Sequence, residues 1–214
     1  MIIIECDQGS EGWHGARAGV ITASMFADAR AKLKSGEKKG QPTSAALDYA
    51  FRLAVERISG QPLDEGFSTW QMKRGNELEP HARLEHELAT GLIVQRAGFI
   101  TTDDGIFGAS ADGLIGEDGG SEYKCFLAPE KLRAFHIDND ASSIMDQVQG
   151  CMWISGRKWW HVGMYCPALE SVGKQLWWHE YQRDDDYIEQ LEADLWQFKL
   201  LVDQYEERLR SEAA

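Results

Sequence analysis

The segment GASADGLIGEDGGSEYKC, residues 108–125, places charged side chains on both sides of a glycine-rich turn. Alternate side chains of a strand share a face, so Glu122 and Lys124 point to one side and Tyr123 to the other. If the glycines let the chain double back, Asp112 lies beside Glu122 on the neighbouring strand. Two carboxylates that close repel each other unless a cation lies between them. The segment therefore predicts a β-hairpin that holds a candidate cation site.

Mg²⁺ suits this pattern, because it accepts one or two protein carboxylates and completes its octahedron with water and substrate phosphate. The backbone carbonyl of Tyr123, between Glu122 and Lys124, is a further candidate ligand. Lys124 could orient or deprotonate an attacking water, or stabilise charge that develops on phosphorus. The segment thus fits metal-assisted hydrolysis of a phosphate ester.

Spacing alone does not distinguish this site from an ordinary surface hairpin. Asp112-Gly113 and Asp118-Gly119 are common turn pairs, and Glu122 and Lys124 would then form a solvent-exposed face. A calcium loop of the EF-hand type is a second alternative, but its D-x-D-x-D-G spacing is absent. The metal interpretation needs support from elsewhere in the chain.

Length and composition indicate one globular domain over residues 1–214. The chain is 43% hydrophobic with eight Trp residues, which suits a packed core rather than disorder. The amino-terminal sequence does not resemble a signal peptide and no apolar run could span a bilayer, so we expect a cytoplasmic protein, in a bacterial or phage-infected cell. Four scattered cysteines without a CxxC pair indicate reduced thiols and argue against a zinc site.

The net charge of −13 argues at first against a nucleic-acid partner. The charge is unevenly distributed, however, because residues 184–214 hold ten acidic side chains against three basic ones, whereas residues 30–41 hold five basic against one acidic. Charges more than about 8–10 Å apart are largely screened at physiological salt. A locally basic channel can therefore coexist with an acidic exterior.

Periodicity and capping residues predict an α/β protein with a central sheet of about five strands. Thr22 and Ser24 are candidate caps for a helix that reaches about Leu33, and Pro42-Thr43 opens another helix that Gly60 ends. Further helices are expected over about 69–90, 128–137, 142–156 and 184–210, and strand-forming runs over 92–100, 106–109, 121–126, 158–166 and 174–182.

The helix predicted over about 69–90 supplies a third acid. RGNELEPHARLEHEL, residues 74–88, carries Glu79 after a Gly and a short polar run. Its glutamates would otherwise be explained as helix-surface charge. His81 and His86 are five residues apart, a poor spacing for shared metal ligation, so we expect them to pack or to face solvent.

With these residues assembled, the chain resembles the lambda-exonuclease (YqaJ-type viral recombinase) family of the PD-(D/E)xK nuclease superfamily. Five segments carry the resemblance in order: WHGARAGVITAS (13–24), RGNELEPHAR (74–83), GASADG (108–113), SEYKC (121–125) and MDQVQGCMW (145–153). Each match is weak alone, but five in order are specific. Beyond about Pro167 the chain matches mainly in its strand and terminal helix.

The resemblance implies a restriction-endonuclease-like core with a mixed central sheet flanked by helices. It also implies that Asp112, Glu122 and the Tyr123 carbonyl bind Mg²⁺, for which Mn²⁺ substitutes, that Lys124 is catalytic, and that Glu79 completes the site, directly or through water. Ala111 replaces the Pro of the superfamily motif, which shapes the turn and binds no metal. Tyr123 stands where relatives often carry an aliphatic residue.

The family also grips the 5′-terminal phosphate of its DNA. The matching positions are Arg17, Thr22, Ser24, Ser110 and Gln149, with Gln147 and Trp13 as alternatives. A guanidinium meets phosphate bidentately, and hydroxyls near a helix start add donors. Considered without the family, Thr22 and Ser24 are plain helix caps and Arg17 a surface residue.

The function implied is a Mg²⁺-dependent exonuclease that degrades linear double-stranded DNA from 5′ to 3′. It would release 5′-mononucleotides and leave a 3′ single strand for phage-type recombination. The resemblance further implies a ring-shaped homotrimer, a single-strand annealing protein as partner, and no membrane. Two alternatives remain: another PD-(D/E)xK nuclease such as a RecB-like enzyme, whose common iron–sulfur cysteines are absent here, or a catalytically silent DNA clamp or docking module.

Overall fold

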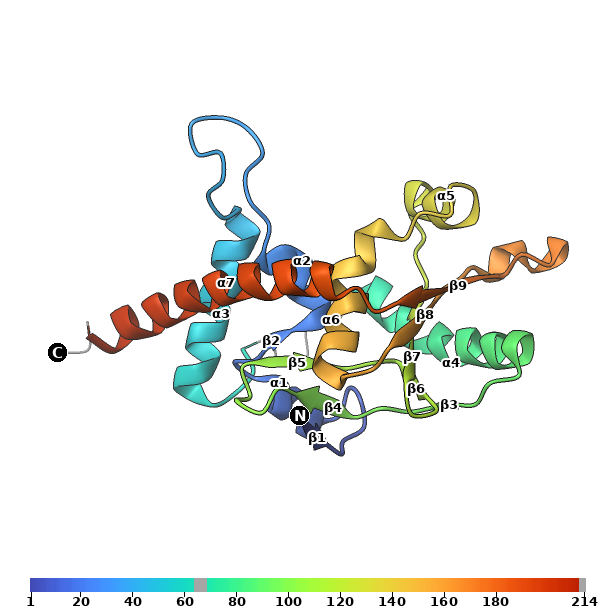
Figure 1. The fold of residues 1–214 in the computed structure, drawn as a ribbon, viewed down its shortest axis with the longest axis horizontal. Helices are drawn as coiled ribbons and strands as arrows, with labels where there is room; N and C mark the ends of the chain where they lie inside the picture. The colour runs from blue at the N-terminus through green and yellow to red at the C-terminus, as the bar shows by residue number, and fades with distance from the viewer. Residues whose placement is uncertain (64–68, 212–214) are drawn as a thin grey trace.

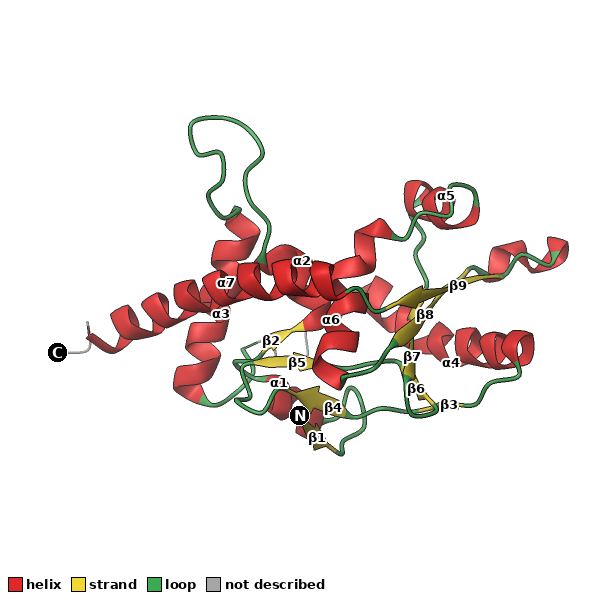
Figure 2. Ribbon diagram, viewed as in Figure 1, coloured by secondary structure: helices red, strands yellow, loops and turns green. Residues whose placement is uncertain are grey.

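The computed structural model describes residues 1–63 and 69–211. It contains two β-sheets, with helices packed on and between them (Figure 1). Figure 2 shows how much of the chain is helical and how the strands gather in the lower half of the view.

A sheet of five strands is present, as predicted, with the order β3-β6-β7-β8-β9, although the predicted run at 106–109 belongs to a second sheet and residues 113–115, expected in the turn, take its place. Its strands are β3 (Val94–Gln95), β6 (Gly113–Ile115), β7 (Gly119–Lys124), β8 (Trp159–Tyr165) and β9 (Leu176–Gln182). β7 and β8 run parallel and the other neighbours are antiparallel, so the sheet is mixed. The strand that carries the Glu-x-Lys motif therefore lies in the middle of the sheet.

A second sheet was not predicted from the sequence. It has the order β1-β4-β5-β2 and consists of β1 (Ile2–Ile4), β4 (Phe99–Thr101), β5 (Phe107–Ala109) and β2 (Ile21–Thr22). The run at residues 92–100 divides into β3 of one sheet and β4 of the other. The division falls at Gly98, where an added Cβ would lie 2.2 Å from the Ile4 carbonyl oxygen.

Two long helices were predicted closely. α3 (Ser44–Ser59) begins after Thr43, whose side chain accepts a hydrogen bond from the Ala46 N–H, and ends at Gly60 in the left-handed conformation. α4 (Trp70–Thr90) contains Pro80 within the helix and packs against β7, β8 and β9. α4 therefore covers one face of the five-stranded sheet.

The helix expected to reach Leu33 is much shorter than predicted. A 3-10 turn η1 (Ala23–Met25) leads into α2 (Phe26–Ala29), and Thr22 makes no side-chain cap. The backbone N–H of Leu33 donates instead to the Gln41 carbonyl. Because the chain pairs with itself across the basic stretch, that stretch becomes a protruding loop rather than a helix (Figure 1).

The other helices complete the architecture. They are α1 (Glu11–Arg17), α5 (Pro129–His136), α6 (Met145–Ser155) and α7 (Asp185–Ser211), with 3-10 turns η2 (Ser142–Ile144) and η3 (Pro167–Val172). α6 contacts β4 and β5 of one sheet and β8 of the other, so it lies between the sheets. α7 crosses α3 and packs through the predicted apolar stripe, of which Ile188, Leu191, Leu195, Phe198 and Val202 are buried and Leu201 is half-buried.

Candidate active site

The turn between β6 and β7 brings the predicted acids together. Gly113 pairs with Ser121 across the two strands, so Asp112, one residue earlier, lies opposite Glu122. Its Oδ2 accepts a hydrogen bond from the Tyr123 backbone N–H at 2.6 Å. The strands pack closely here, because a Cβ on Gly113 would lie 2.0 Å from Val94 Cγ1. The hairpin therefore fixes the position of the Asp112 carboxylate relative to β7.

Glu122, Lys124 and Gln147 form a hydrogen-bonded triangle on the face of β7 that meets α6. Lys124 Nζ donates to Glu122 Oε1 at 2.7 Å and to Gln147 Oε1 at 2.9 Å. Gln147 Nε2 donates to the same Glu122 oxygen at 2.6 Å. Tyr123 faces the other way and contacts α4, so the alternation predicted for this strand is present. The lysine and the glutamate are thus held in one orientation.

Glu79 approaches the same acids from α4. Its Oε1 accepts a hydrogen bond from Arg83 Nη2 at 2.8 Å, one helical turn away. Burial nevertheless raises the pKa of Glu79, with a further contribution from the negative charge of Glu122. The structure therefore brings Glu79 within electrostatic reach of Glu122, as the sequence predicted.

The electrostatics of this cluster favour the uptake of a cation. Burial, together with the charges of Glu122 and Glu79, raises the pKa of Asp112 well above its usual value. Burial opposes the charge on Lys124, but Glu122 and Asp112 outweigh it and raise the pKa of this ammonium group. Lys124 and Arg83 face three carboxylates, so negative charge is still in excess.

The donor atoms of the cluster fit Mg²⁺. Within the described residues, three or more His, Cys, Asp or Glu side chains do not lie close enough to hold a metal by themselves. Mg²⁺ does not require such a cage, because it keeps several waters. In this part of the chain the buried Oε2 of Glu122 has no hydrogen-bond partner, which leaves one carboxylate oxygen for a cation. The N–H and C=O of a strand residue point the same way, so the Tyr123 carbonyl faces the side where Asp112 lies.

A second cluster forms around Arg17, the last residue of α1. Arg17 Nη1 donates to Ser110 Oγ at 3.0 Å, and Nη2 lies 3.4 Å from Thr22 Oγ1. Ser24 Oγ lies 3.4 Å from the same Thr22 oxygen. Trp13 Nε1 donates to Ser110 Oγ at 2.9 Å, and its ring lies under the guanidinium at 4.2 Å. These five predicted residues converge on one point.

The Arg17 cluster has the properties of an anion site. The hydrogen bonds of the guanidinium go to hydroxyl groups, which carry no charge to neutralise it. Burial lowers the pKa of Arg17, which shows that its charge is poorly solvated. A phosphate would supply both the missing charge and bidentate acceptors. Thr22 and Ser24 therefore face Arg17 rather than capping a helix.

Residues 12–158 match the YqaJ-like viral recombinase domain. The chain belongs to that family. Among curated proteins, no match is found.

Solved structures extend the similarity over nearly the whole chain. LHK-Exo in complex with dAMP is 30% identical with a TM-score of 0.82, over 95% of this chain and 98% of that one. The alkaline exonuclease LHK-Exo from Laribacter hongkongensis is 29% identical with a TM-score of 0.80, over the same shares of the two chains. A phage-related exonuclease from Haemophilus somnus 129PT shares the fold at 17% identity and a TM-score of 0.68, over 91% and 96%. The predicted α/β class and restriction-endonuclease-like core agree with these matches.

One residue that the YqaJ-type resemblance implied lies elsewhere. Gln149 Nε2 donates to the Gln182 carbonyl at 3.0 Å, and its Oε1 accepts from the Asp184 N–H at 3.0 Å. Its amide therefore joins α6 to the end of β9, and these bonds do not run to the Arg17 cluster. Two helical residues that are two apart point about 200° apart, so Gln147 faces the acids instead. Gln147, the alternative, is the glutamine that contacts Glu122 and Lys124.

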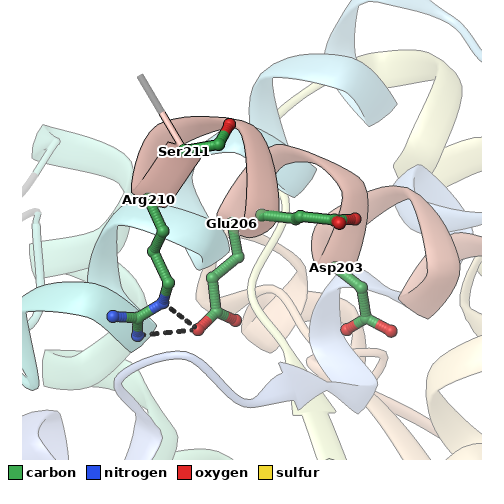
Figure 3. A pocket seen from close by; sticks show the side chains of 5 residues that line it. Asp203, Glu206, Arg210 and Ser211 are labelled. Atoms are coloured by element: carbon green, nitrogen blue, oxygen red, sulfur yellow. Dashed lines mark hydrogen bonds and ion pairs between the residues drawn. The ribbon is translucent and has the colours of Figure 1, made fainter. Parts of the chain in front are cut away.

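The terminal helix of this YqaJ-type chain carries a hollow that is unrelated to the two clusters (Figure 3). It is lined by Asp203, Glu206, Glu207, Arg210 and Ser211. Glu206 pairs with Arg210 at 2.8 Å, so the remaining charge is negative and repels phosphate. In the part of the chain that the structure describes, no helix is long and apolar enough to cross a membrane.

Proposed function

We propose that this protein is a Mg²⁺-dependent exonuclease that degrades linear double-stranded DNA from the 5′ end and releases 5′-mononucleotides. The observation that carries the proposal is the link between the two clusters. Ser110 binds Arg17 and Trp13, and Asp112, two residues later, lies beside Glu122. A phosphate grip and a hydrolytic cluster are thus within about one nucleotide of each other, because two residues of chain span at most roughly 7 Å.

Family membership supports the reaction class. The two LHK-Exo structures, which cover almost the whole chain, are of an alkaline exonuclease, and one of them contains dAMP. A deoxynucleoside 5′-monophosphate is the product that our proposal requires. The 3′ single strand left behind would serve recombination by strand annealing.

Each residue of the acidic cluster has a role in the proposed reaction. Asp112, Glu122 and the Tyr123 carbonyl would hold Mg²⁺, with Glu79 binding it directly or through water. When bound, the ion would polarise the phosphodiester and lower the pKa of a water molecule. Lys124, which Glu122 and Gln147 hold in place, would orient the attacking water and stabilise negative charge on the phosphate oxygens.

The Arg17 cluster would determine which end of the duplex is attacked. Arg17 would bind the terminal phosphate bidentately, while Ser110, Thr22 and Ser24 donate through their hydroxyls. The stacking of Arg17 on Trp13 fixes the plane of the guanidinium. A terminal phosphate carries more negative charge than an internal one, so the cluster favours 5′-phosphorylated ends.

Assembly and partners are also proposed on family grounds. We expect a ring-shaped homotrimer around the duplex, a single-strand annealing protein as partner, and action in the cytoplasm of a bacterial or phage-infected cell. Mn²⁺ should substitute for Mg²⁺. Sedimentation equilibrium tests the assembly, since a purely monomeric protein would contradict the ring.

End polarity is the decisive measurement. A blunt duplex carries one 5′-phosphate, with a different fluorophore on each strand, and is incubated with and without MgCl₂. We expect mononucleotides to be released faster from the phosphorylated strand than from the other, and none without metal or with Asp112→Asn. Degradation from the 3′ end would indicate a different PD-(D/E)xK nuclease. Binding without any product would indicate a silent clamp.

A further inference from the structure

A chain of hydrogen bonds, buried except at its outer end, begins at the hydroxyl of Tyr123, on the opposite face of β7 from the lysine. This oxygen lies 2.9 Å from His86 Nδ1 on α4. His86 Nε2 lies 2.8 Å from His161 Nδ1 on β8, and His161 Nε2 lies 3.1 Å from Glu180 Oε2 on β9. Four elements are thereby joined through polar atoms, and none of these side-chain contacts belongs to the proposed chemistry.

The donor and the acceptor of each hydrogen bond in this chain follow from Glu180 at its outer end. A carboxylate only accepts hydrogen bonds, so His161 must carry its proton on Nε2 and accept on Nδ1. His86 must then carry its proton on Nε2 and accept on Nδ1, which leaves the Tyr123 hydroxyl as the donor. Both imidazoles are buried, which disfavours a charged ring, so each ring carries a single proton. The chain is therefore fully satisfied in one arrangement of protons.

The three inner members of this hydrogen-bond chain lie in a closed environment, whereas the side chain of Glu180 at its outer end is 46% exposed. His86 is fully buried, Tyr123 is 6% exposed and His161 3% exposed. The Trp178 ring packs against both imidazoles, with centroids 5.7 and 4.8 Å away. A buried polar group without a partner is destabilising, so the loss of one inner member leaves its neighbour unsatisfied.

Each residue of the Tyr123–His86 contact is linked to the acidic cluster. Tyr123 holds Asp112 through its backbone N–H and presents its carbonyl to the same side. His86 is seven residues after Glu79 on α4, which places the two side chains on one face of the helix, two turns apart. The contact therefore fixes the distance between α4, which carries Glu79, and β7, which carries Glu122 and holds Asp112 through a backbone hydrogen bond.

We propose that Tyr123 and His86, oriented by His161 and Glu180, are positioning residues that hold the Tyr123 carbonyl, Asp112 and Glu79 in the geometry that binds the metal. This inference rests on the proposed function. It predicts that disrupting this hydrogen-bond chain weakens metal binding and slows turnover. DNA binding should be unaffected, because it depends on the separate Arg17 cluster. A purely structural role would lower the thermal stability alone.

The first test determines the tautomers of the two histidines and does not depend on enzymatic activity. In metal-free protein with ¹⁵N-labelled histidines, long-range ¹H–¹⁵N spectra should show both His86 and His161 as Nε2–H tautomers. Assignment uses His86→Gln and His161→Gln. An Nδ1–H tautomer at either ring would overturn the proposed chain.

The second test measures its consequence with Tyr123→Phe, which removes one hydroxyl, and with Tyr205→Phe on α7 as the matched control. We expect a severalfold weaker Mg²⁺ affinity by calorimetry and a kcat lowered on the order of tenfold, with KM for DNA unchanged. Tyr205→Phe should match the wild type in Mg²⁺ affinity, kcat and KM. Wild-type Mg²⁺ affinity and kcat in Tyr123→Phe would overturn the inference.

A second pair of variants covers the case in which Tyr123→Phe does not fold. Glu180→Gln keeps an acceptor for His161 and should retain the Mg²⁺ affinity of the wild type. Glu180→Ala removes this acceptor and should bind Mg²⁺ more weakly. Equal affinities in the two variants would contradict the inference. If the wild-type protein cleaves no DNA, the proposed function fails, while the tautomers and the Mg²⁺ affinity still decide whether the chain positions the acids.

Discussion

Arg17 Nη1 lies 3.0 Å from Ser110 Oγ, although the two residues are 93 positions apart in the sequence. The contact joins the end of α1 to the segment that leads directly into Asp112. An arginine that would otherwise be a surface residue is thereby placed against the chain segment that carries Asp112.

Substitution of Arg17 should remove the preference for phosphorylated ends. A charge-assisted hydrogen bond is worth about 1.5–3 kcal/mol, so Arg17→Ala should lower kcat/KM on 5′-phosphorylated duplex by roughly ten- to a hundredfold. Activity on 5′-hydroxyl duplex should change little, because that substrate lacks the terminal charge. Arg210→Ala, which removes an exposed arginine of α7, is the control. An undiminished preference in Arg17→Ala would remove Arg17 from the phosphate grip.

Substitution of Lys124 should abolish cleavage and spare binding. Lys124→Ala deprives Glu122 of its ammonium partner and should lower kcat by roughly 100- to 1,000-fold, the usual cost of removing one donor that stabilises charge in the transition state. Fluorescence anisotropy with labelled duplex should give a Kd within twofold of the wild type. Lys158→Ala is the matched control, since Lys158 is an exposed lysine paired with Asp118. Wild-type turnover in Lys124→Ala would refute its proposed role.

The buried histidine should make the stability of the protein depend on pH. The pKa of His86 is lowered to about 4 in the folded protein, so between pH 6.5 and 4 the unfolded chain binds a proton that the folded one does not. Its contribution is therefore present above pH 6.5 and is lost as the pH falls towards 4, by roughly 3 kcal/mol. His86→Gln should flatten this part of the urea-unfolding profile. His81→Gln, at an exposed position on the same helix, should not.

The wild type must be compared with His86→Gln because Asp112 changes the stability of the protein with pH in the direction opposite to His86. Its raised pKa means that the folded protein retains a proton above the usual carboxyl range. In metal-free protein its contribution to stability therefore decreases as the pH rises. The difference between the wild type and His86→Gln cancels this effect. A profile for His86→Gln that parallels the wild type from pH 4 to 6.5 would contradict the assignment.

The close approach at Gly113 should make it intolerant of a side chain. A methyl group there would overlap Val94 Cγ1 and Ser121 Oγ, so Gly113→Ala should destabilise the protein by about 1–3 kcal/mol. Gly75 is the control, because an added Cβ meets nothing within 4 Å on α4. Gly75→Ala should stabilise the helix by about 0.5–1 kcal/mol. Chemical denaturation of both variants measures the difference, and equal effects would rule out crowding at the hairpin.

Sequence patterns correctly predicted the elements that are determined by neighbouring residues, such as helix caps and the alternation along a strand. α3 follows from its Thr43 cap and its terminal Gly60, and the alternation along β7 correctly separates Lys124 from Tyr123. The same alternation buries Trp160 and Trp177 and leaves Trp159 and Trp178 half-buried beside His161.

Long-range contacts explain what the sequence did not predict. The helix expected to reach Leu33 was wrong because the loop pairs with itself, and Arg30 instead binds Asp146 and Asp194. The choice between Gln147 and Gln149 depends on how α6 is rotated between the two sheets, which helical spacing alone does not fix. His86 was grouped with the exposed His81. The one sequence signal for its role was a tyrosine where an aliphatic residue is common.

The junction between the two sheets has a further consequence. β5 ends at Ala109 and β6 begins at Gly113, so three residues join the sheet beside the phosphate grip to the sheet that carries the acids. In the proposed reaction these residues act as a molecular ruler, since their covalent length sets how far from the terminus the bond is cut. The size of the excised product would then be encoded in the connection itself, and lengthening the connection should change the product before it changes the chemistry.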